Sequence, residues 1–157
     1  MRMRGIKGVE FPDVPIEVFE WGLNLNLRGP FYFGHAVLKQ MREQRGGLII
    51  NVGSITGEEG TSKSMDYATA KAGLMYGLTK SQAQYGSQYG IRSVCISPGP
   101  VMSRPGMAKM KTLLGRAGET QEIIDLMLFI ASDRGQFING ENIMIDGGRC
   151  ALEVPYA

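Results

Sequence analysis

Apolar and polar positions alternate along the chain in blocks that predict helices and strands. From residue 16 to 44, apolar side chains recur close to every third or fourth position, as on one face of a helix. The positions that set this spacing are Val18, Trp21, Leu25, Phe31, Val37, Leu38 and Met41. Gly29 and Pro30 interrupt the pattern, because a proline inside a helix removes a backbone hydrogen bond. The spacing therefore predicts one long helix with a break.

Continuous apolar runs predict the strands. Leu48 to Val52 is such a run, and it suits a central parallel strand that is buried on both faces. A second buried strand is predicted at residues 91–97 and a short last strand at about 142–146. Helical patterns at about 65–89 and 119–131 lie between these strands. Strands that alternate with helices are typical of βαβ units and a parallel sheet, so we expect an α/β fold.

Three side chains around the first strand suggest proton chemistry. Ser54 follows the strand, and Tyr67 and Lys71 lie four positions apart on one face of the next helix. A free phenol titrates near pH 10, and a neighbouring ammonium lowers that pKa toward the range useful for general acid–base catalysis. The Ser54 hydroxyl would hold the oxygen that exchanges the proton. A Tyr-x-x-x-Lys pair also occurs by chance on exposed helices, so the spacing alone decides nothing.

Further motifs strengthen this interpretation. Asn26 stands within NLRGPF, SPGPV occupies 97–101 and IDGG occupies 145–148. With these motifs the chain resembles the short-chain dehydrogenase/reductase family from about Val14 to Gly148. The resemblance implies the carboxyl-terminal half of a Rossmann-type fold with a three-layer parallel sheet. It also implies NAD or NADP as cofactor and a small-molecule alcohol or ketone as substrate.

The same resemblance assigns a catalytic tetrad. Tyr67 would donate or accept the proton opposite the nicotinamide, and Lys71 would lower its pKa and hold the nicotinamide ribose. Ser54 would polarise the carbonyl. Asn26 would orient a water through its main chain, although a kinked core helix is the plainer explanation for Asn26 taken alone.

The turn after the second strand is the other expected cofactor contact. Strand ends at the carboxyl edge of an open α/β sheet are where ligands bind, although an ordinary turn has the same sequence. Ser103 stands where the family has a threonine. The predicted cofactor-binding residues are Tyr67, Lys71, Pro98, Gly99, Val101 and Ser103. The following segment, 102–114, is in the family's lid position, where its methionines form either an adaptable apolar lid or the core side of an amphipathic turn.

One departure from the family is large. No Gly-x-Gly occurs in the sequence, and the family's opening strand, Gly-rich turn and Asn-Ala-Gly stretch are not present. We therefore expect the carboxyl-terminal part of such an enzyme, with weak dinucleotide binding in isolation and the strand at 48–52 left as an exposed edge. The choice between NAD and NADP cannot be read, because the residues that make it lie in the absent part. The alternative is a non-catalytic, degenerate relative that acts as an oligomerisation or scaffold module.

The composition indicates which kinds of binding partner to expect. The 157 residues, 43% apolar and 20% charged, predict a single domain, 1–157, with residues 1–15 as an irregular lead-in. Lys and Arg exceed Asp and Glu by 17 − 15 = 2, too few to indicate nucleic acid or an anionic membrane. No apolar run reaches the length of a spanning helix. A small-molecule partner is favoured.

The remaining reactive side chains predict no metal site. Cys95 and Cys150 have neither metal-ligand spacing nor a disulfide framework, so we expect free thiols in a reducing cytoplasm. His35 has no ligand partner at suitable spacing and is interpreted as structural. In the family, the helix at 67–89 and the helix before it pack against their copies in a neighbouring subunit, so the resemblance implies a homo-oligomer, either a dimer or a tetramer. The tail after Gly148 is interpreted as an extension that reaches a neighbouring subunit.

Overall fold

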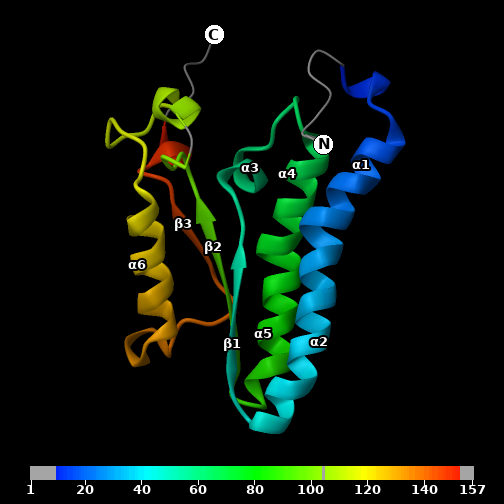
Figure 1. Cartoon of the computed structure of the whole chain (residues 1–157), viewed down its shortest axis with the longest axis vertical. Helices are drawn as coiled ribbons and strands as arrows, with labels where there is room; N and C mark the ends of the chain where they lie inside the picture. The colour runs from blue at the N-terminus through cyan, green and yellow to red at the C-terminus, as the bar shows by residue number, and fades with distance from the viewer. Residues whose placement is uncertain (1–9, 104, 153–157) are drawn as a thin grey trace.

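The computed structural model describes residues 10–103 and 105–152, which form three layers (Figure 1). The helices on one face of the sheet are α1 (Ile16–Leu23), α2 (Gly29–Gln44), α4 (Met65–Ala72) and α5 (Thr79–Ser87), and α6 (Thr120–Ala131) covers the other face. The predicted three-layer α/β arrangement is confirmed. Of the predicted lead-in, residues 1–9 lie outside the described residues, and Phe11–Asp13 form a 3-10 turn. Within the described ranges, no helix is long and apolar enough to cross a bilayer.

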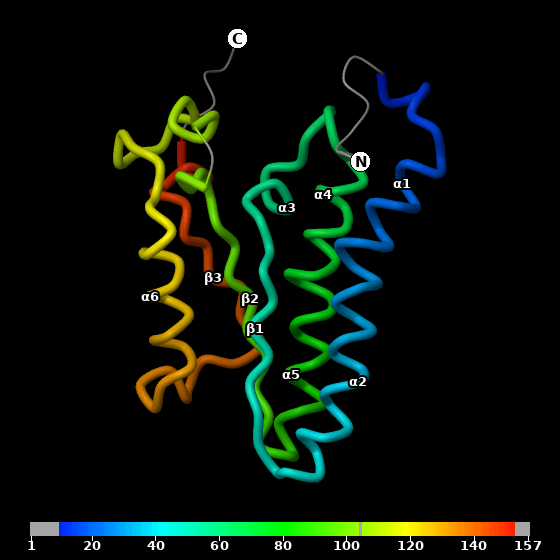
Figure 2. The backbone as a smooth tube through the Cα atoms, viewed as in Figure 1, coloured from blue at the N-terminus to red at the C-terminus, as the bar shows by residue number. Residues whose placement is uncertain are grey.

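The sheet has three parallel strands in the order β1-β2-β3. They are β1 (Gly47–Val52), β2 (Ile91–Pro98) and β3 (Asn142–Ile145). The predicted strands are therefore confirmed, each with one boundary shifted by a single residue. Figure 2 shows β1, β2 and β3 side by side between the paired helices and α6.

β2 is the centre of the core. Its side chains point alternately to the two faces of the sheet. Val94 and Ile96 are fully buried and pack against Ile130 of α6. The residues that alternate with them are small and also buried: Ser93, Cys95 and Ser97. Small side chains on that face let α4 and α5 lie close to the sheet.

The prediction that the first strand is buried on both faces is wrong for β1. Val52 is 45% exposed, and Asn51 is the only fully buried residue of the strand. Among the described residues β1 pairs with β2 alone, so its other edge is open. The burial of a strand depends on its neighbours in space, which the local pattern does not specify. The edge position itself agrees with the expectation drawn from the absent family segments.

The predicted break in the first long helix is confirmed, but it starts earlier. Residues Asn24–Arg28 form a π-helical turn, η2, in which backbone bonds span five residues instead of four. The Gly29 N–H, for example, donates to the Asn24 carbonyl. Pro30 follows directly and has no N–H to offer the carbonyl four residues earlier, which belongs to Asn26. The widened turn therefore falls on the candidate asparagine.

A second π-helical turn, η3 (Gly73–Leu78), separates α4 from α5 and was not predicted. The Thr79 hydroxyl donates to the Leu74 carbonyl at 2.7 Å, which bonds a carbonyl of the widened turn. Leu27 of η2 packs against Gly73, where an added Cβ would lie 3.2 Å from Leu27 Cδ2. The two widened turns thus contact each other. Neither this contact nor the hydroxyl bond shows in the apolar spacing of the sequence.

A buried polar network joins the sheet to α5. Asn51 Nδ2 donates to Thr79 Oγ1 and to Gln82 Oε1, each at 2.9 Å. Ser93 Oγ donates to the same Gln82 oxygen at 2.9 Å. Gln82 Nε2 is buried against Gly34 of α2 and has no hydrogen-bond partner. These bonds fix β1, β2 and α5 relative to one another beneath the catalytic candidates.

Candidate functional site

A cavity of about 590 Å³ opens at the carboxyl ends of β1 and β2. Six of the predicted site residues line it: Ser54, Tyr67, Pro98, Gly99, Val101 and Ser103. They come from the end of β1, from α4 and from the turn after β2. The strand ends of a parallel sheet meet at one edge, and this brings residues distant in sequence into one cavity.

Ser54 is held at the cavity by a helix that the sequence did not predict. The expected loop contains α3 (Ile55–Glu59), and Ser54 is its N-cap: Ser54 Oγ accepts from the Thr56 N–H at 3.2 Å. Serine is among the preferred N-caps because its oxygen satisfies a free amide of the first turn. The hydroxyl hydrogen remains available for donation to an oxygen in the cavity.

Tyr67 and Lys71 lie one turn apart on α4. Lys71 Nζ lies 5.5 Å from the centroid of the Tyr67 ring. The same Nζ donates to the Val52 carbonyl at 2.7 Å. The Gly53 N–H donates to the Ile96 carbonyl of β2. The Val52 carbonyl belongs to the same peptide group, and because that peptide is trans, the carbonyl points away from β2. Lys71 therefore lies over the open edge of β1.

Asn26 lies on the same open side. Its Nδ2 donates to the Gly22 carbonyl at 3.1 Å, which fixes the side chain against its own helix. Asn26 and Lys71 line a pocket of about 350 Å³ along the edge of β1, and Val52 lines both this pocket and the Tyr67 cavity. The four predicted catalytic residues thus gather around the end of β1 in two adjoining pockets. Their roles, including the water expected at Asn26, stay predictions.

The turn after β2 is shaped by close packing against β3. A Cβ on Gly99 would lie 2.6 Å from the Cα of Asp146, so only glycine fits there. The Gly118 N–H donates to the Pro100 carbonyl and the Met102 N–H to the Gly118 carbonyl, each at 2.8 Å. These bonds tie the turn to the segment before α6.

The segment between these ties is the expected lid. It contains a 3-10 turn, Pro105–Lys109, and Met107 and Met110 from it and beyond it line the cavity. Met102, the third methionine considered, is exposed and does not line the cavity. Two of the three methionines thus reach the candidate site, and their role as an apolar lid stays a prediction.

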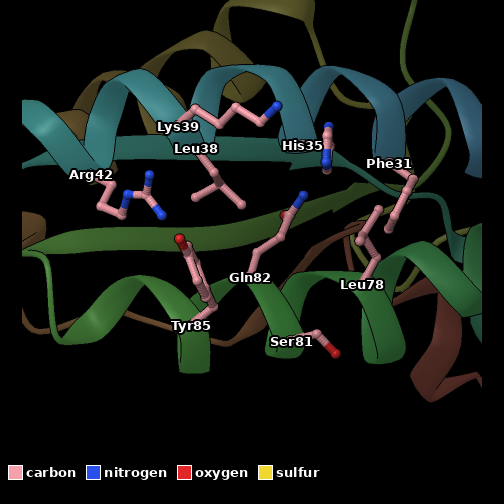
Figure 3. A pocket seen from close by; sticks show the side chains of 9 residues that line it. All are labelled: Phe31, His35, Leu38, Lys39, Arg42, Leu78, Ser81, Gln82 and Tyr85. Carbon is pink, nitrogen blue, oxygen red and sulfur yellow. The ribbon is translucent and has the colours of Figure 1, made fainter.

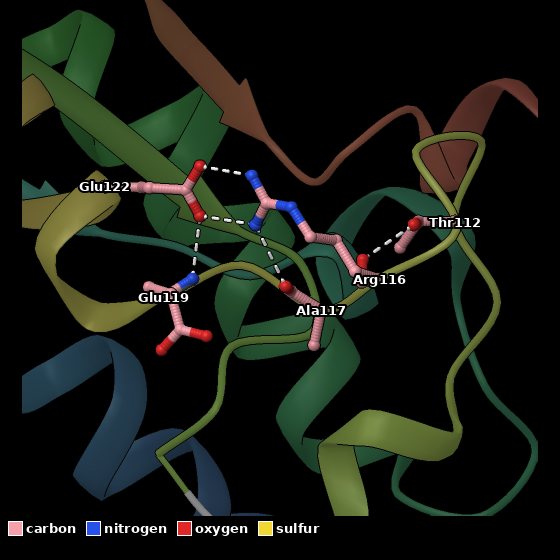
Figure 4. Close-up of polar contacts among 5 residues, drawn as sticks. All are labelled: Thr112, Arg116, Ala117, Glu119 and Glu122. Carbon is pink, nitrogen blue, oxygen red and sulfur yellow. Dashed lines mark hydrogen bonds and ion pairs between the residues drawn. The ribbon is translucent and has the colours of Figure 1, made fainter.

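An ion pair fixes the beginning of α6 beside the cavity (Figure 4). Both terminal nitrogens of Arg116 donate to the Glu122 carboxylate, at 2.7 and 2.8 Å. Glu122 also accepts from the Glu119 N–H at 2.7 Å as part of a capping box. Arg116, and then the Glu119 amide, lower the pKa of Glu122 to about 2. Thr112 Oγ1 donates to the Arg116 carbonyl, which extends the contact to the loop.

Several cavity residues were missed from the sequence. They are Ile55 and Thr56 of α3 and Thr120, Ile123, Ile124 and Met127 of α6. The α6 residues recur at the three- and four-residue spacing of one helix face, so the signal was present. This spacing identifies an apolar face of the helix, but it does not show that the face lines this cavity.

A separate groove of about 380 Å³ lies between α2 and α5 (Figure 3). The α2 side carries Phe31, His35, Leu38, Lys39 and Arg42, and the α5 side carries Ser81, Gln82 and Tyr85, with Leu78 of η3 beside them. His35 stacks on the Phe31 ring, with 6.3 Å between centroids, so its role in the groove is a packing one. The groove contains no carboxylate among its described lining residues.

The two cysteines are free thiols, as predicted. Burial raises the pKa of Cys95. Burial and then the hydrogen bond with Asp146 raise the pKa of Cys150 to about 12. Both thiols are therefore protonated near neutral pH and are poor nucleophiles. In the part of the chain that the structure describes, no group of His, Cys, Asp or Glu could hold a metal ion.

Residues 4–149 match a family model described as enoyl-(acyl carrier protein) reductase. The chain is 42% identical over 144 residues to trans-4-hydroxycyclohexanecarboxylate dehydrogenase of Sinomonas cyclohexanicum, covering 88% of this chain and 54% of that protein. It is 36% identical over 135 residues to a 3-oxoacyl-[acyl-carrier-protein] reductase of Thermotoga maritima, covering 80% of this chain and 54% of that one. The chain thus spans about half the length of the curated relatives it matches.

Solved structures agree with this similarity. An acetoin dehydrogenase from Salmonella typhimurium superposes with a TM-score of 0.85 at 25% identity, covering 94% of this chain and 61% of the other. A 4-hydroxyisoleucine dehydrogenase complexed with NADH gives a TM-score of 0.85 at 28% identity, covering 96% and 65%. The fold and the chain order of its elements are therefore those of these dehydrogenases.

Proposed function

Because this chain belongs to the short-chain dehydrogenase/reductase family, we propose that it supplies the proton-transfer groups of an NAD(P)-dependent oxidoreductase that interconverts an alcohol and a ketone. The observation that carries the proposal is the cavity shared by Ser54 and Tyr67, with Lys71 Nζ 5.5 Å from the Tyr67 ring. A phenol, a hydroxyl and a cation at one strand edge are the groups that such a reaction requires.

Each side chain has a distinct task in this reaction. Tyr67 gives a proton to the carbonyl oxygen during reduction and takes it back during oxidation. Ser54, whose oxygen accepts from the Thr56 amide, donates its hydroxyl hydrogen to the same substrate oxygen. Lys71 places a positive charge beside the phenol ring, with its Nζ 5.5 Å from the ring centroid. Asn26 keeps its place in η2 and orients a water with its main-chain carbonyl.

The same cavity fits the nicotinamide end of the cofactor. Its polar side chains are all hydroxyls, from Ser54, Thr56, Tyr67, Ser103 and Thr120. The turn at Gly99 lets the chain pass closely over β3. Tyr67, Lys71, Pro98, Gly99, Val101 and Ser103 would hold that end. When bound, the nicotinamide supplies or accepts the hydride. The sequence offers no Gly-x-Gly turn for the pyrophosphate, so that part of the cofactor needs groups beyond these residues.

The test joins this chain to the amino-terminal half of the Thermotoga maritima reductase, because that half supplies the groups that this sequence lacks. We expect the 157-residue chain alone to show no micromolar binding of NADH or NADPH by calorimetry, and the chimera to bind one of them and reduce a ketone panel. Tyr67→Phe in the chimera should lower kcat by roughly 10²–10⁴-fold with cofactor binding little changed.

The matched control is Tyr32→Phe, which removes the hydroxyl of a tyrosine exposed on α2. It should leave kcat within about twofold, since a surface hydroxyl takes no part in proton transfer. A Tyr67→Phe chimera as active as this control would refute the assignment. Micromolar binding of either nucleotide by the isolated chain would refute the expectation for the fragment.

The groove between α2 and α5 favours a second role, in self-association as a homo-oligomer. Phe31 and Leu38 expose apolar surface there beside the unpartnered donor of Gln82. Light scattering should give a mass above that of the monomer for the parent, and Leu38→Glu should reduce it. A chimera that assembles but shows no activity with any ketone or nucleotide would favour the scaffold alternative. The two protonated thiols suit a reducing compartment such as the cytoplasm.

A further inference from the structure

A third pocket lies apart from the Tyr67 cavity, between residues 11–19 and the start of α4. Its volume is about 370 Å³, and none of its described lining residues lines the Tyr67 cavity. The walls are mainly apolar: Phe11, Pro12, Val14, Ile16, Val18, Phe19 and Met65. Ser62, Lys63, Ser64 and Asp66 complete the lining. Pockets of this size and character bind small organic molecules, oriented by a few polar groups.

Asp66 is the unusual member of this lining. The residue as a whole is 6% exposed, so its side chain lies mostly below the surface. A Cβ on Gly22 of α1 would lie 2.2 Å from Asp66 Oδ2, so the absence of a side chain at position 22 makes the space that the carboxylate occupies. Among residues 10–103 and 105–152, no hydrogen bond or ion pair satisfies the Asp66 carboxylate.

A buried carboxylate without a partner is unfavourable. Buried charges in proteins are normally paired or hydrogen-bonded, because removing them from water costs several kcal/mol. The first turn of α4 places its positive end near Asp66 and offsets part of this cost. Lys63 lines the same pocket but forms no ion pair with Asp66 within the described ranges. The pocket therefore presents a negative charge at the end of an apolar space.

We propose that this pocket binds a small organic ammonium ion with an apolar body. The ammonium group donates a charge-assisted hydrogen bond to Asp66, and such bonds are about twice as strong as neutral ones. The apolar body contacts Ile16 and Val18, and the rings of Phe11 and Phe19 offer faces to a cation. Asp66 precedes Tyr67 directly, but the two side chains line different cavities, so this site is separate from the proposed reaction.

The experiment compares three probes that share one body and differ in charge. Phenethylammonium, 2-phenylethanol and 3-phenylpropionate are titrated separately into the 157-residue chain, followed by calorimetry and ¹H–¹⁵N NMR. We expect the ammonium ion to bind and to shift the amides of residues 62–66. The alcohol should bind at least 10-fold more weakly, because it lacks the charged hydrogen bond. The anion should bind more weakly still, because its charge repels Asp66.

Two variants locate the site. Asp66→Asn keeps the shape of the side chain and should weaken phenethylammonium binding roughly 10- to 100-fold while leaving 2-phenylethanol unchanged. Gly22→Ala should have a similar effect, because its Cβ would displace the carboxylate. Asp125→Asn, on the exposed surface of α6, is the control and should change nothing.

The proposal is overturned by any of three results. The first is no ammonium binding by the parent up to about 10 mM, the weak end of specific recognition. The second is equal affinity for the ammonium ion and the alcohol, a comparison that needs no variant and so does not depend on Asp66→Asn folding. The third is an Asp66→Asn protein that folds and binds the ammonium ion as tightly as the parent.

Discussion

β1 and β2 have similar sequences and opposite surroundings. Both are short and contain Val and Ile, and β1 was predicted to be buried on both faces. β2 lies between two strands, with Val94 and Ile96 fully buried. β1 has one neighbour among the described residues, and Val52 remains 45% exposed. A run of apolar residues therefore predicts a strand, but the position of that strand in the sheet determines how much free energy its side chains contribute.

The largest test of this difference is the loss of a buried side chain from β2. Ile96→Ala should lower the free energy of unfolding by about 2–5 kcal/mol, because it leaves a cavity against Ile130. Urea denaturation followed by circular dichroism measures the change. Val52→Ala on β1 is the matched comparison and should cost clearly less. Equal losses at the two positions would contradict the difference between the strands.

Asn51 tests the one part of β1 that is as buried as β2. Asn51→Ala removes the donor shared by Thr79 and Gln82, and we expect a loss of about 1–3 kcal/mol in the free energy of unfolding. The control is Asn24→Ala, an exposed residue of η2 that should stay within about 0.5 kcal/mol of the parent. An Asn51→Ala protein as stable as the control would mean that the network contributes nothing.

Glu122 lies on α6, the helix that packs against β2, and we expect it to make a smaller, pH-dependent contribution to stability. Because its pKa falls from 4.5 to about 2 on folding, the ion pair with Arg116 stabilises the fold above about pH 5 and this stabilisation disappears as the pH approaches 2. The melting temperature of Glu122→Gln should therefore lie below that of the parent at pH 7 and meet it near pH 2. Glu43→Gln, an exposed residue of α2, is the control at both pH values. A gap that does not narrow in acid would contradict the assigned cause.

The smallest effect on stability is expected beside the open edge of β1. Phe33 is 77% exposed and lines the pocket along that edge. Phe33→Ser should change the free energy of unfolding by no more than about 0.5 kcal/mol and should reduce self-association in size-exclusion chromatography. Phe137→Ser removes an even more exposed ring elsewhere and should leave association unchanged. If both variants associate like the parent, the surface beside β1 is not the contact.

The sequence predicted the elements better than their environments. Strands at 47–52 and 91–98 followed from apolar runs, and the break near Pro30 followed from the chemistry of its ring. The η3 turn was not predicted, and its contact with Leu27 at Gly73 joins residues far apart in the chain. Local spacing does not contain such contacts.

The candidate site was predicted in the same uneven way. Ser54 and Tyr67 were predicted from their spacing to Lys71 and from the motifs that resemble the family, and the structure brings them to one cavity. Asn26 and Lys71 line a different pocket from Ser54 and Tyr67, and the sequence did not predict this separation. It depends on the open edge of β1 and on the hydrogen bond from Lys71 Nζ to the Val52 carbonyl. The sequence predicted the apolar face of α6 but not that this face lines the cavity.

The bridge between Val101 and Gly118 has an evolutionary consequence. It closes the segment between them into a loop whose ends stay fixed, so a change in the length of the loop moves neither β2 nor α6. The entropic cost of closing a loop grows slowly with its length, and doubling the length costs only about 0.6 kcal/mol. Insertions and deletions at this place can therefore accumulate at little cost to folding, and the wall of the cavity that carries Met107 and Met110 can diversify while Ser54 and Tyr67 stay in place.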